Sequence, residues 1–182
     1  MVEIRRLEPS DRRDAFSCGV STLDEFLRRY AGQNMWVRHT GVTYVAIDDE
    51  SRRVLGFMTV SGSHGSRDEL PGLPSSMPAY PLPLLRVARL AVDTRVSGTG
   101  IGSALVLFAC ELAVAQTERV GCVGIIVDAK SDAVGFYERF GFTAMSALAG
   151  ASSVRPRQTP MFLELPKVRA ALGEELDQRP PY

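Results

Sequence analysis

Three closely spaced glycines, Gly98, Gly100 and Gly102, interrupt an apolar segment near the middle of the 182-residue chain. The run before them, LLRVARLAVD (84–93), is typical of a strand, and apolar residues recur with helical spacing over 101–118. The first-turn amides of a helix have no intrahelical partners, and together with the positive end of the helix dipole they bind phosphate. The stretch therefore predicts a strand, a phosphate-binding turn and a helix.

Other phosphate-binding folds fit this turn less well. The spacing is GxGxG, whereas the dinucleotide fingerprint needs GxGxxG at the start of a βαβ unit. A Walker loop needs Gly-Lys-Ser or Gly-Lys-Thr, and neither tripeptide occurs in the chain. A tight strand-to-helix turn without a ligand is the remaining alternative.

The first half of the chain alternates strand and helix patterns. Residues 2–8 alternate like an edge strand, and 42–48 with 54–62 flank a polar turn as in a hairpin. Between the edge strand and the hairpin we expect an amphipathic helix with Ser21 as its N-cap and Asp24 in its first turn. Its apolar residues, up to Tyr30, are expected to face the core.

A proline-rich connection precedes the glycine turn. Because it holds Pro71, Pro74, Pro78, Pro81 and Pro83, it is expected to be a surface loop from about residue 63 to 84 without helix or central strand.

The second half predicts strands at 122–129, 141–148 and 160–165, with a helix at about 131–140. Antiparallel strands followed by a βαβα unit indicate an α+β fold with a mixed sheet. We expect one domain over 1–166 and a polar tail over 167–182 that is helical or disordered.

Composition limits the function classes. The formal net charge is zero, so any nucleic-acid contact needs a local basic patch, and 19 of the 21 basic residues are arginine, the residue suited to bidentate phosphate contacts. The expectation is a cytoplasmic protein without signal peptide or membrane span. The three cysteines form no CxxC pair, which favours buried thiols and no metal site.

Two segments resemble the Gcn5-related N-acetyltransferases (GNAT), which bind acetyl-CoA. One is the turn, which fits the family's Q/R-x-x-G-x-G/A pattern when the pattern begins at Arg95. In the register usual before a GIG triplet, the pattern begins at Ser97, and serine stands where the family has Gln or Arg. The other is DAVGFYERFGF (132–142), with Tyr137 at the family's tyrosine and Lys130 where the family often has asparagine. The resemblance implies a mostly antiparallel sheet flanked by helices, with acetyl-CoA in a cleft between splayed central strands. It implies coenzyme contacts from Leu90, Ala91, Val92, Arg95, Ser97, Gly98, Thr99, Gly100, Ile101, Gly102 and Ser103.

Further segments, at 16–27, 80–93 and 160–165, are similar to the acetyltransferase toxins of bacterial toxin–antitoxin modules. That resemblance implies an enzyme that acetylates the α-amino group of aminoacyl-tRNA and blocks translation. It also implies a ribbon-helix-helix antitoxin as partner and a homodimer.

The chemistry assigns roles to a few residues. Tyr137 would act as general acid, and backbone amides near Ala91 and Val92 would stabilise the oxyanion. No His or Glu on the central strand offers a base, and Asp93 suits a cap or turn role at least as well. Since an α-amine has a pKa of about 7.7 to 8.0, it can lose its proton to water.

Five arginines are candidates for tRNA binding, with an ordinary solvated surface as the alternative: Arg28, Arg29, Arg38, Arg86 and Arg89. Two other functions stay open. One is acetylation of a small amine or a protein N-terminus, and the other is a non-catalytic acyl-CoA-binding regulator.

Overall fold

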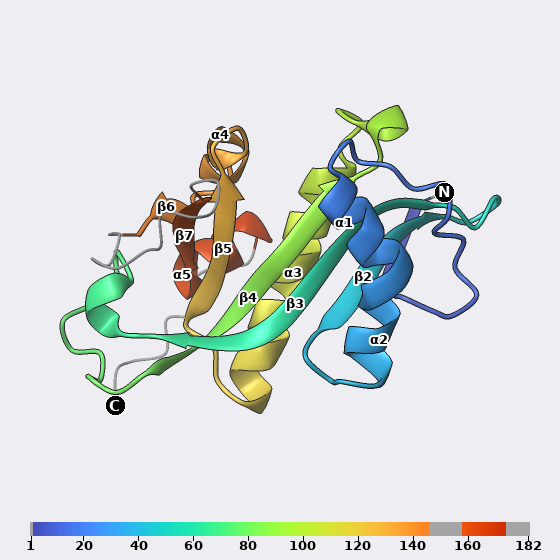
Figure 1. Cartoon of the computed structure of the whole chain (residues 1–182). Coiled ribbons are helices and arrows are strands. Elements are labelled where there is room, and N and C mark those ends of the chain that lie inside the picture. Colours follow the sequence, from blue (N-terminus) through green and yellow to red (C-terminus); the bar gives the residue numbers. More distant parts are fainter. Residues whose placement is uncertain (1, 146–157, 174–182) are drawn as a thin grey trace. The chain divides into compact units, whose positions relative to one another are not determined.

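The computed structural model describes residues 2–145 and 158–173, which form two compact units. The first unit comprises the chain up to Ser61 and Val87–Ala109, and the second comprises Gly62–Arg86 and the chain from Cys110 onward. Strands β3 (Val54–Gly65) and β4 (Leu82–Val92) and helix α3 (Ile101–Arg119) contribute residues to both units (Figure 1).

The first unit contains the edge strand and the hairpin that the sequence predicts. Strand β1 (Val2–Arg6) pairs antiparallel with β2 (Val42–Asp48), and β2 pairs antiparallel with β3, so the order is β1-β2-β3-β4. At the hairpin turn, the Arg52 amide donates to the Asp48 carbonyl at 2.8 Å. Both the edge position of β1 and the hairpin are confirmed.

The first helical region is not the single helix that the pattern predicts. It consists of α1 (Ser21–Glu25), a π-helical segment η1 (Phe26–Tyr30) and α2 (Ala31–Trp36). The prediction of Ser21 as N-cap is wrong, because Val20 holds that position. Asp24 lies in the first turn as predicted and is buried, and its carboxylate accepts hydrogen bonds from the Cys18 amide at 2.8 Å and the Ser17 hydroxyl at 3.1 Å. Tyr30 is exposed, not inward.

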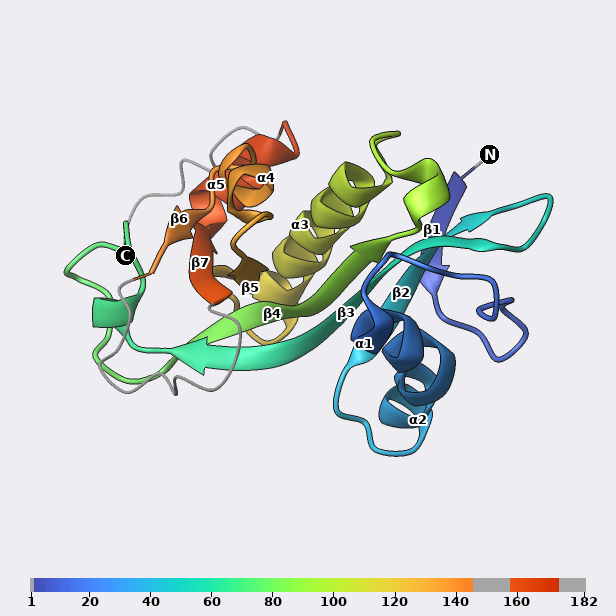
Figure 2. The same ribbon diagram turned by 45° about the horizontal axis from the view of Figure 1, so that its top comes forward.

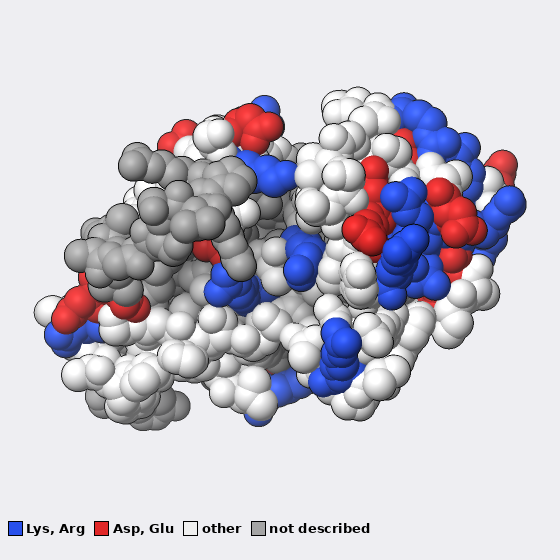
Figure 3. Space-filling view, in the orientation of Figure 1, with Lys and Arg blue, Asp and Glu red and all other residues white. Residues whose placement is uncertain are grey.

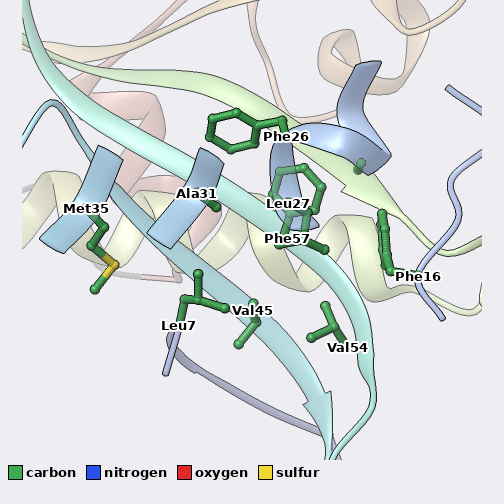
Figure 4. Close-up of a cluster of buried hydrophobic side chains, with 10 residues drawn as sticks. Leu7, Phe16, Phe26, Leu27, Ala31, Met35, Val45, Val54 and Phe57 are labelled. Atoms are coloured by element: carbon green, nitrogen blue, oxygen red, sulfur yellow. The ribbon is translucent and has the colours of Figure 1, made fainter. Parts of the chain in front are cut away.

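Helices cover both faces of the strands in the first unit (Figures 1 and 2). On one face, the ring of Phe57 from β3 lies 5.5 Å from that of Phe16 and 6.0 Å from that of Phe26. Figure 4 shows the core around them: Leu7, Phe16, Phe26, Leu27, Ala31, Met35, Val45, Val54 and Phe57. Neighbouring residues of a strand face opposite sides, and Gly56 accordingly packs against Ile101 and Leu105 of α3. A β-carbon at Gly56 would lie 2.8 Å from Cγ2 of Ile101, so α3 sits close to the strand because this residue is glycine.

The second unit contains β5 (Gly124–Lys130), β7 (Gln158–Glu164) and β6 (Thr143–Ala144). The order is β3-β4-β5-β7-β6, and β7 pairs antiparallel with both neighbours. The last strand along the chain therefore lies inside the sheet. The predicted strand at 141–148 is confirmed only for β6, and residues beyond 145 in it lie outside the described part.

The proline-rich loop is shorter than the sequence predicts. Strand β3 runs to Gly65, the 3-10 helix η2 (Arg67–Glu69) follows, and β4 already begins at Leu82. Pro83 thus lies in a strand, which corrects the expectation. Proline has no N–H to donate to a neighbouring strand, but the Pro83 carbonyl still accepts a hydrogen bond from the Val123 amide at 2.9 Å. A second core cluster of Leu70, Leu82, Leu84 and Phe162 anchors the loop to the sheet.

Helix α4 (Val134–Glu138) is shorter than the predicted 131–140, because residues on both sides form turns. Helix α5 (Leu165–Ala171) follows β7 directly and places Val168 in the core. Residues 174–182 of the predicted tail lie outside the described part of the chain.

Helix α3 qualifies the expectation that no segment is long and apolar enough to cross a membrane. By length and composition alone, its 19 residues could span one. In this structure one face of the helix, with Leu105, Val106 and Ala109, is buried in the protein.

Candidate functional site

The glycine turn lies between a strand and a helix, as its sequence predicts, and two of its glycines have positive φ. Gly98 has a φ of +79° and Gly100 a φ of +93°, values that residues with a β-carbon rarely adopt. A β-carbon at either residue would meet nothing within 4 Å, so the surface of the turn is open. The turn connects the 3-10 helix η3 (Thr94–Val96) to α3, which begins at Ile101 as predicted.

Several amides of this turn have no partner in the described chain. The first helical bond is from the Ala104 amide to the Gly100 carbonyl, at 2.9 Å, which leaves the three preceding amides free. The backbone amides of Gly98 and Gly100 likewise donate no hydrogen bond within the described chain, and both residues are exposed. The free donors are those of Gly98, Gly100, Ile101, Gly102 and Ser103. Together with the positive end of a 19-residue helix, they fit the pyrophosphate of a coenzyme.

Arg95 is held by the protein itself. Its guanidinium contacts the Asp93 carboxylate and donates to the Ala15 carbonyl at 2.7 Å. If the pyrophosphate pattern begins at Ser97, its two glycines are Gly100 and Gly102. Both then lie at the start of α3, which begins at Ile101. Ser97 is exposed at the start of the turn. Coenzyme contacts by Arg95, Ser97 and Thr99 stay predictions.

Asp93 is not a free base. It is buried and accepts hydrogen bonds from the Arg95 side chain, the Arg95 amide at 3.0 Å and the Ser17 amide at 3.3 Å. The bond from the Arg95 side chain is the main cause that lowers the pKa of Asp93 to about 2. Because the Thr94 amide also donates to the Ser17 carbonyl at 2.9 Å, this cluster ties the segment before α1 to the end of β4. The sequence suggested the cap role of Asp93, but not its link to Ser17, which is 76 residues away.

At the end of β4, successive backbone amides point alternately toward β3 and away from it. The Asp93 amide donates to the Leu55 carbonyl of β3 at 2.8 Å. In an antiparallel ladder, amides two residues apart point to the same neighbour, so that of Ala91 also points to β3. Those of Leu90 and Val92 point to the opposite edge of β4. Of the two predicted oxyanion donors, Val92 has the better orientation.

Tyr137, in the second unit, has a buried ring and an accessible hydroxyl. Its ring packs edge-on against Phe136 at 5.1 Å and Phe142 at 5.4 Å between centroids. Every buried side-chain oxygen in the described chain has a hydrogen-bond partner, and the Tyr137 hydroxyl has none there, so Oη must reach the surface. Burial raises the pKa of Tyr137 to about 12, which keeps the hydroxyl protonated at neutral pH.

The five arginines proposed for tRNA have different surroundings. Arg28, Arg29 and Arg38 are exposed, and Figure 3 shows acidic and basic side chains intermixed on this region of the first unit. Arg29 lies 3.3 Å from Glu25, and Arg38 donates to the Asn34 side chain at 3.4 Å. In the second unit, Arg86 pairs with Asp128 of β5.

Arg89 differs from the other four. Its guanidinium lies over the ring of Phe26, 3.9 Å from the centroid. The sequence contains no local signal for this pair, since 63 positions separate the two residues.

Comparisons with known proteins agree with this geometry. Residues 39–144 match the family described as "Acetyltransferase (GNAT) domain". The chain is 32% identical over 139 residues to a protein of Mycobacterium tuberculosis (strain ATCC 25618 / H37Rv) named tRNA-acetylating toxin, covering 76% of this chain and 82% of that protein.

Solved structures are similar over nearly the whole chain. A tyrosine-to-phenylalanine variant of KacT is 25% identical with a TM-score of 0.80, covering 93% of this chain and 98% of that one. AtaT complexed with acetyl-methionyl-tRNAfMet is 24% identical with a TM-score of 0.79, covering 94% and 99%. These likenesses confirm the predicted fold, with a mostly antiparallel sheet flanked by helices.

Proposed function

Because this chain belongs to the GNAT acetyltransferase family, we propose that it transfers the acetyl group of acetyl-CoA to the α-amino group of aminoacyl-tRNA and thereby stops translation. The observation that carries the proposal is the 32% identity to a tRNA-acetylating toxin over three quarters of the chain. The structure of AtaT in complex with acetyl-methionyl-tRNAfMet agrees with an acceptor of this class.

Backbone amides of the glycine turn would hold the pyrophosphate of the coenzyme. The free donors from Gly98 to Ser103 are hydrogen-bond donors fixed by the backbone, so they need no rearrangement to bind an anion. When bound, acetyl-CoA supplies an activated thioester carbonyl and a thiolate leaving group. The Val92 amide, which points away from β3, would donate to the oxygen that becomes negative as the amine attacks.

Tyr137 would protonate the departing sulfur. Its pKa of about 12 means that Oη carries its proton over the whole neutral range, and the buried ring fixes the position of Oη. The acceptor amine needs no strong base from the protein, because an α-amine with a pKa of about 7.7 to 8.0 is partly neutral near pH 7. This agrees with the state of Asp93, whose carboxylate is fully engaged by Arg95 and Ser17.

The test is transfer of label from acetyl-CoA to a pool of charged total tRNA by purified wild type and Tyr137→Phe. We expect label in the RNA with wild type and a rate at least about tenfold lower with the variant, since general acids contribute this much or more. Uncharged tRNA is the control, because it lacks the amine. Label that enters methioninamide or a peptide N-terminus and no RNA would support the alternative acceptors. Coenzyme binding without any turnover would support a regulator.

We also infer an antitoxin partner of the ribbon-helix-helix type and a homodimer. The structure of an AtaT variant bound to the C-terminus of the antitoxin AtaR supports an antitoxin partner, of whatever fold, for a relative of this kind. The test is growth arrest on expression, its relief by co-expression of a neighbouring small gene, and the mass of the purified protein in sedimentation. Growth that continues unchanged while active protein accumulates would contradict the toxin role.

A further inference from the structure

Arg89 is an exposed cation that lies against an aromatic ring and has no carboxylate partner among the described residues. Its guanidinium carbon lies 3.9 Å above the Phe26 ring, a cation–π contact. Partial burial of the side chain lowers its pKa, and no acidic residue contributes to that shift. Among the described residues, no Asp or Glu lies within ion-pair distance of Arg89, whereas Arg29 and Arg86 each have a carboxylate.

The stack determines which atoms of Arg89 can bind a ligand. The guanidinium carbon lies over the Phe26 ring, so the N–H groups that point away from the ring remain available as donors. Phe26 is itself fixed, because it is 5% exposed and stacks on Phe57 at 6.0 Å. The guanidinium of Arg89 can therefore donate two hydrogen bonds to an anion with two acceptor oxygens, such as a phosphate.

Arg89 is also close to the proposed chemistry along the chain. It lies in β4, three residues before Val92, the proposed oxyanion donor. At about 3.3 Å per residue, the two backbone positions are about 10 Å apart in a strand. An anion on Arg89 would thus belong to the acceptor molecule near its reacting amine. The 3′ end of a tRNA carries phosphates there, whereas a small amine such as methioninamide has none.

We propose that Arg89, held on Phe26, binds a backbone phosphate at the aminoacyl end of the tRNA and so holds the acceptor in the site. This role rests on the proposed function. It makes Arg89 a binding residue for the acceptor and distinguishes it from Arg86 and Arg29, whose charge is already matched by Asp128 and Glu25.

The experiment measures kcat and KM for charged total tRNA with wild type, Arg89→Gln and Arg89→Lys at several salt concentrations. Loss of one charged hydrogen-bonded contact should raise KM about tenfold in Arg89→Gln with kcat nearly unchanged. The slope of log(kcat/KM) against log salt should become shallower by about 0.7 to 0.9, the value for one phosphate. Arg89→Lys should give a KM between those of wild type and Arg89→Gln, because lysine keeps the positive charge and loses the bidentate hydrogen-bonding geometry of the guanidinium.

Three controls make the result specific. Arg119→Gln, at the end of α3, removes the same charge elsewhere and should leave both KM and the salt slope unchanged. Acetyl-CoA affinity should be equal in wild type and Arg89→Gln, which shows that the variant is folded. Phe26→Leu keeps an apolar side chain under Arg89 but removes the ring, and should raise KM less than Arg89→Gln does.

The outcomes separate the two proposals. Wild type that labels methioninamide and no tRNA refutes the proposed function, and the role of Arg89 falls with it. Wild type that labels tRNA, with KM and salt slope unchanged in Arg89→Gln, refutes the role of Arg89 alone. A loss confined to kcat, or a loss of acetyl-CoA binding, would also overturn it, because either would indicate a role at the coenzyme.

Discussion

Asp93 and Arg95 hold each other through two hydrogen bonds, from Nε of Arg95 to Oδ1 at 2.8 Å and from Nη2 to Oδ2 at 2.5 Å. The same carboxylate accepts from the Ser17 amide, so one buried charge connects the end of β4, the turn before the glycines and the segment before α1. A planar fork on a carboxylate is among the strongest side-chain pairs, because both hydrogen bonds are charge-assisted.

Acid should destabilise the protein through Asp93. Its pKa falls from 3.8 to about 2 on folding, so the stabilisation is complete above about pH 4 and is lost as the pH falls toward about 2. The linked free energy is about 2 kcal/mol. Asp93→Asn should therefore lower the free energy of unfolding at neutral pH by about that amount, and the deficit should shrink in acid. Urea unfolding at several pH values measures it. Asp128→Asn, in an exposed pair with Arg86, is the control and should cost less than about 1 kcal/mol. A deficit in Asp93→Asn that is the same at all pH values would contradict the assignment.

Gly100→Ala should weaken acetyl-CoA binding as well as stability. The residue has a φ of +93°, so alanine there should cost about 1 to 2 kcal/mol of backbone strain and shift the amides that follow. Gly173→Ala is a matched control, because Gly173 has a φ of +73° and an equally open surrounding but lies after α5. Calorimetric titration with acetyl-CoA should show weaker binding for Gly100→Ala only. Equal affinities in the two variants would remove the turn from the coenzyme site.

Gly56→Ala should loosen the contact between β3 and α3. The new β-carbon would lie 2.8 Å from Ile101 Cγ2 and 3.2 Å from the Ala91 carbonyl oxygen, so strand or helix must move, at a cost of about 1 to 3 kcal/mol. Gly62→Ala is the control in the same strand, because its β-carbon would meet nothing within 4 Å. Thermal unfolding should give a lower Tm for Gly56→Ala than for Gly62→Ala. Identical values would mean that α3 is not held by this close approach.

The pH–rate profile should show no alkaline limb from Tyr137. Its pKa of about 12 keeps the general acid protonated up to about pH 11, while the acceptor amine loses its proton between about pH 7 and 9. With charged tRNA as acceptor, kcat/KM should rise through that range and then level off. Rates measured in short assays avoid hydrolysis of the aminoacyl ester, and ester half-life at each pH is the control. A fall between about pH 8 and 10 that Tyr137→Phe abolishes would show a hydroxyl with a much lower pKa.

The local elements were predictable from the sequence because their signals lie within a few residues. The start of α3 at Ile101, the glycine turn before it, and the hairpin of β2 and β3 follow from turn chemistry and from apolar periodicity. The family resemblance of the glycine turn and of the segment around Tyr137 added the acetyltransferase fold. Its coenzyme contacts remain predictions.

Contacts between distant parts of the chain could not be predicted in this way. Asp24 has the position of an ordinary first-turn acid, and it is buried only because the segment before α1 turns its Cys18 amide toward it. Periodicity likewise did not show that β7 lies between β5 and β6. Arg86 and Arg89 look equivalent as basic residues of one strand, but the first meets Asp128 and the second meets Phe26. The sequence by itself thus determined which segments are strand, turn and helix, because backbone preference and periodicity are local. The tertiary structure alone decided which charges are neutralised and which remain available, because the partners come from other elements.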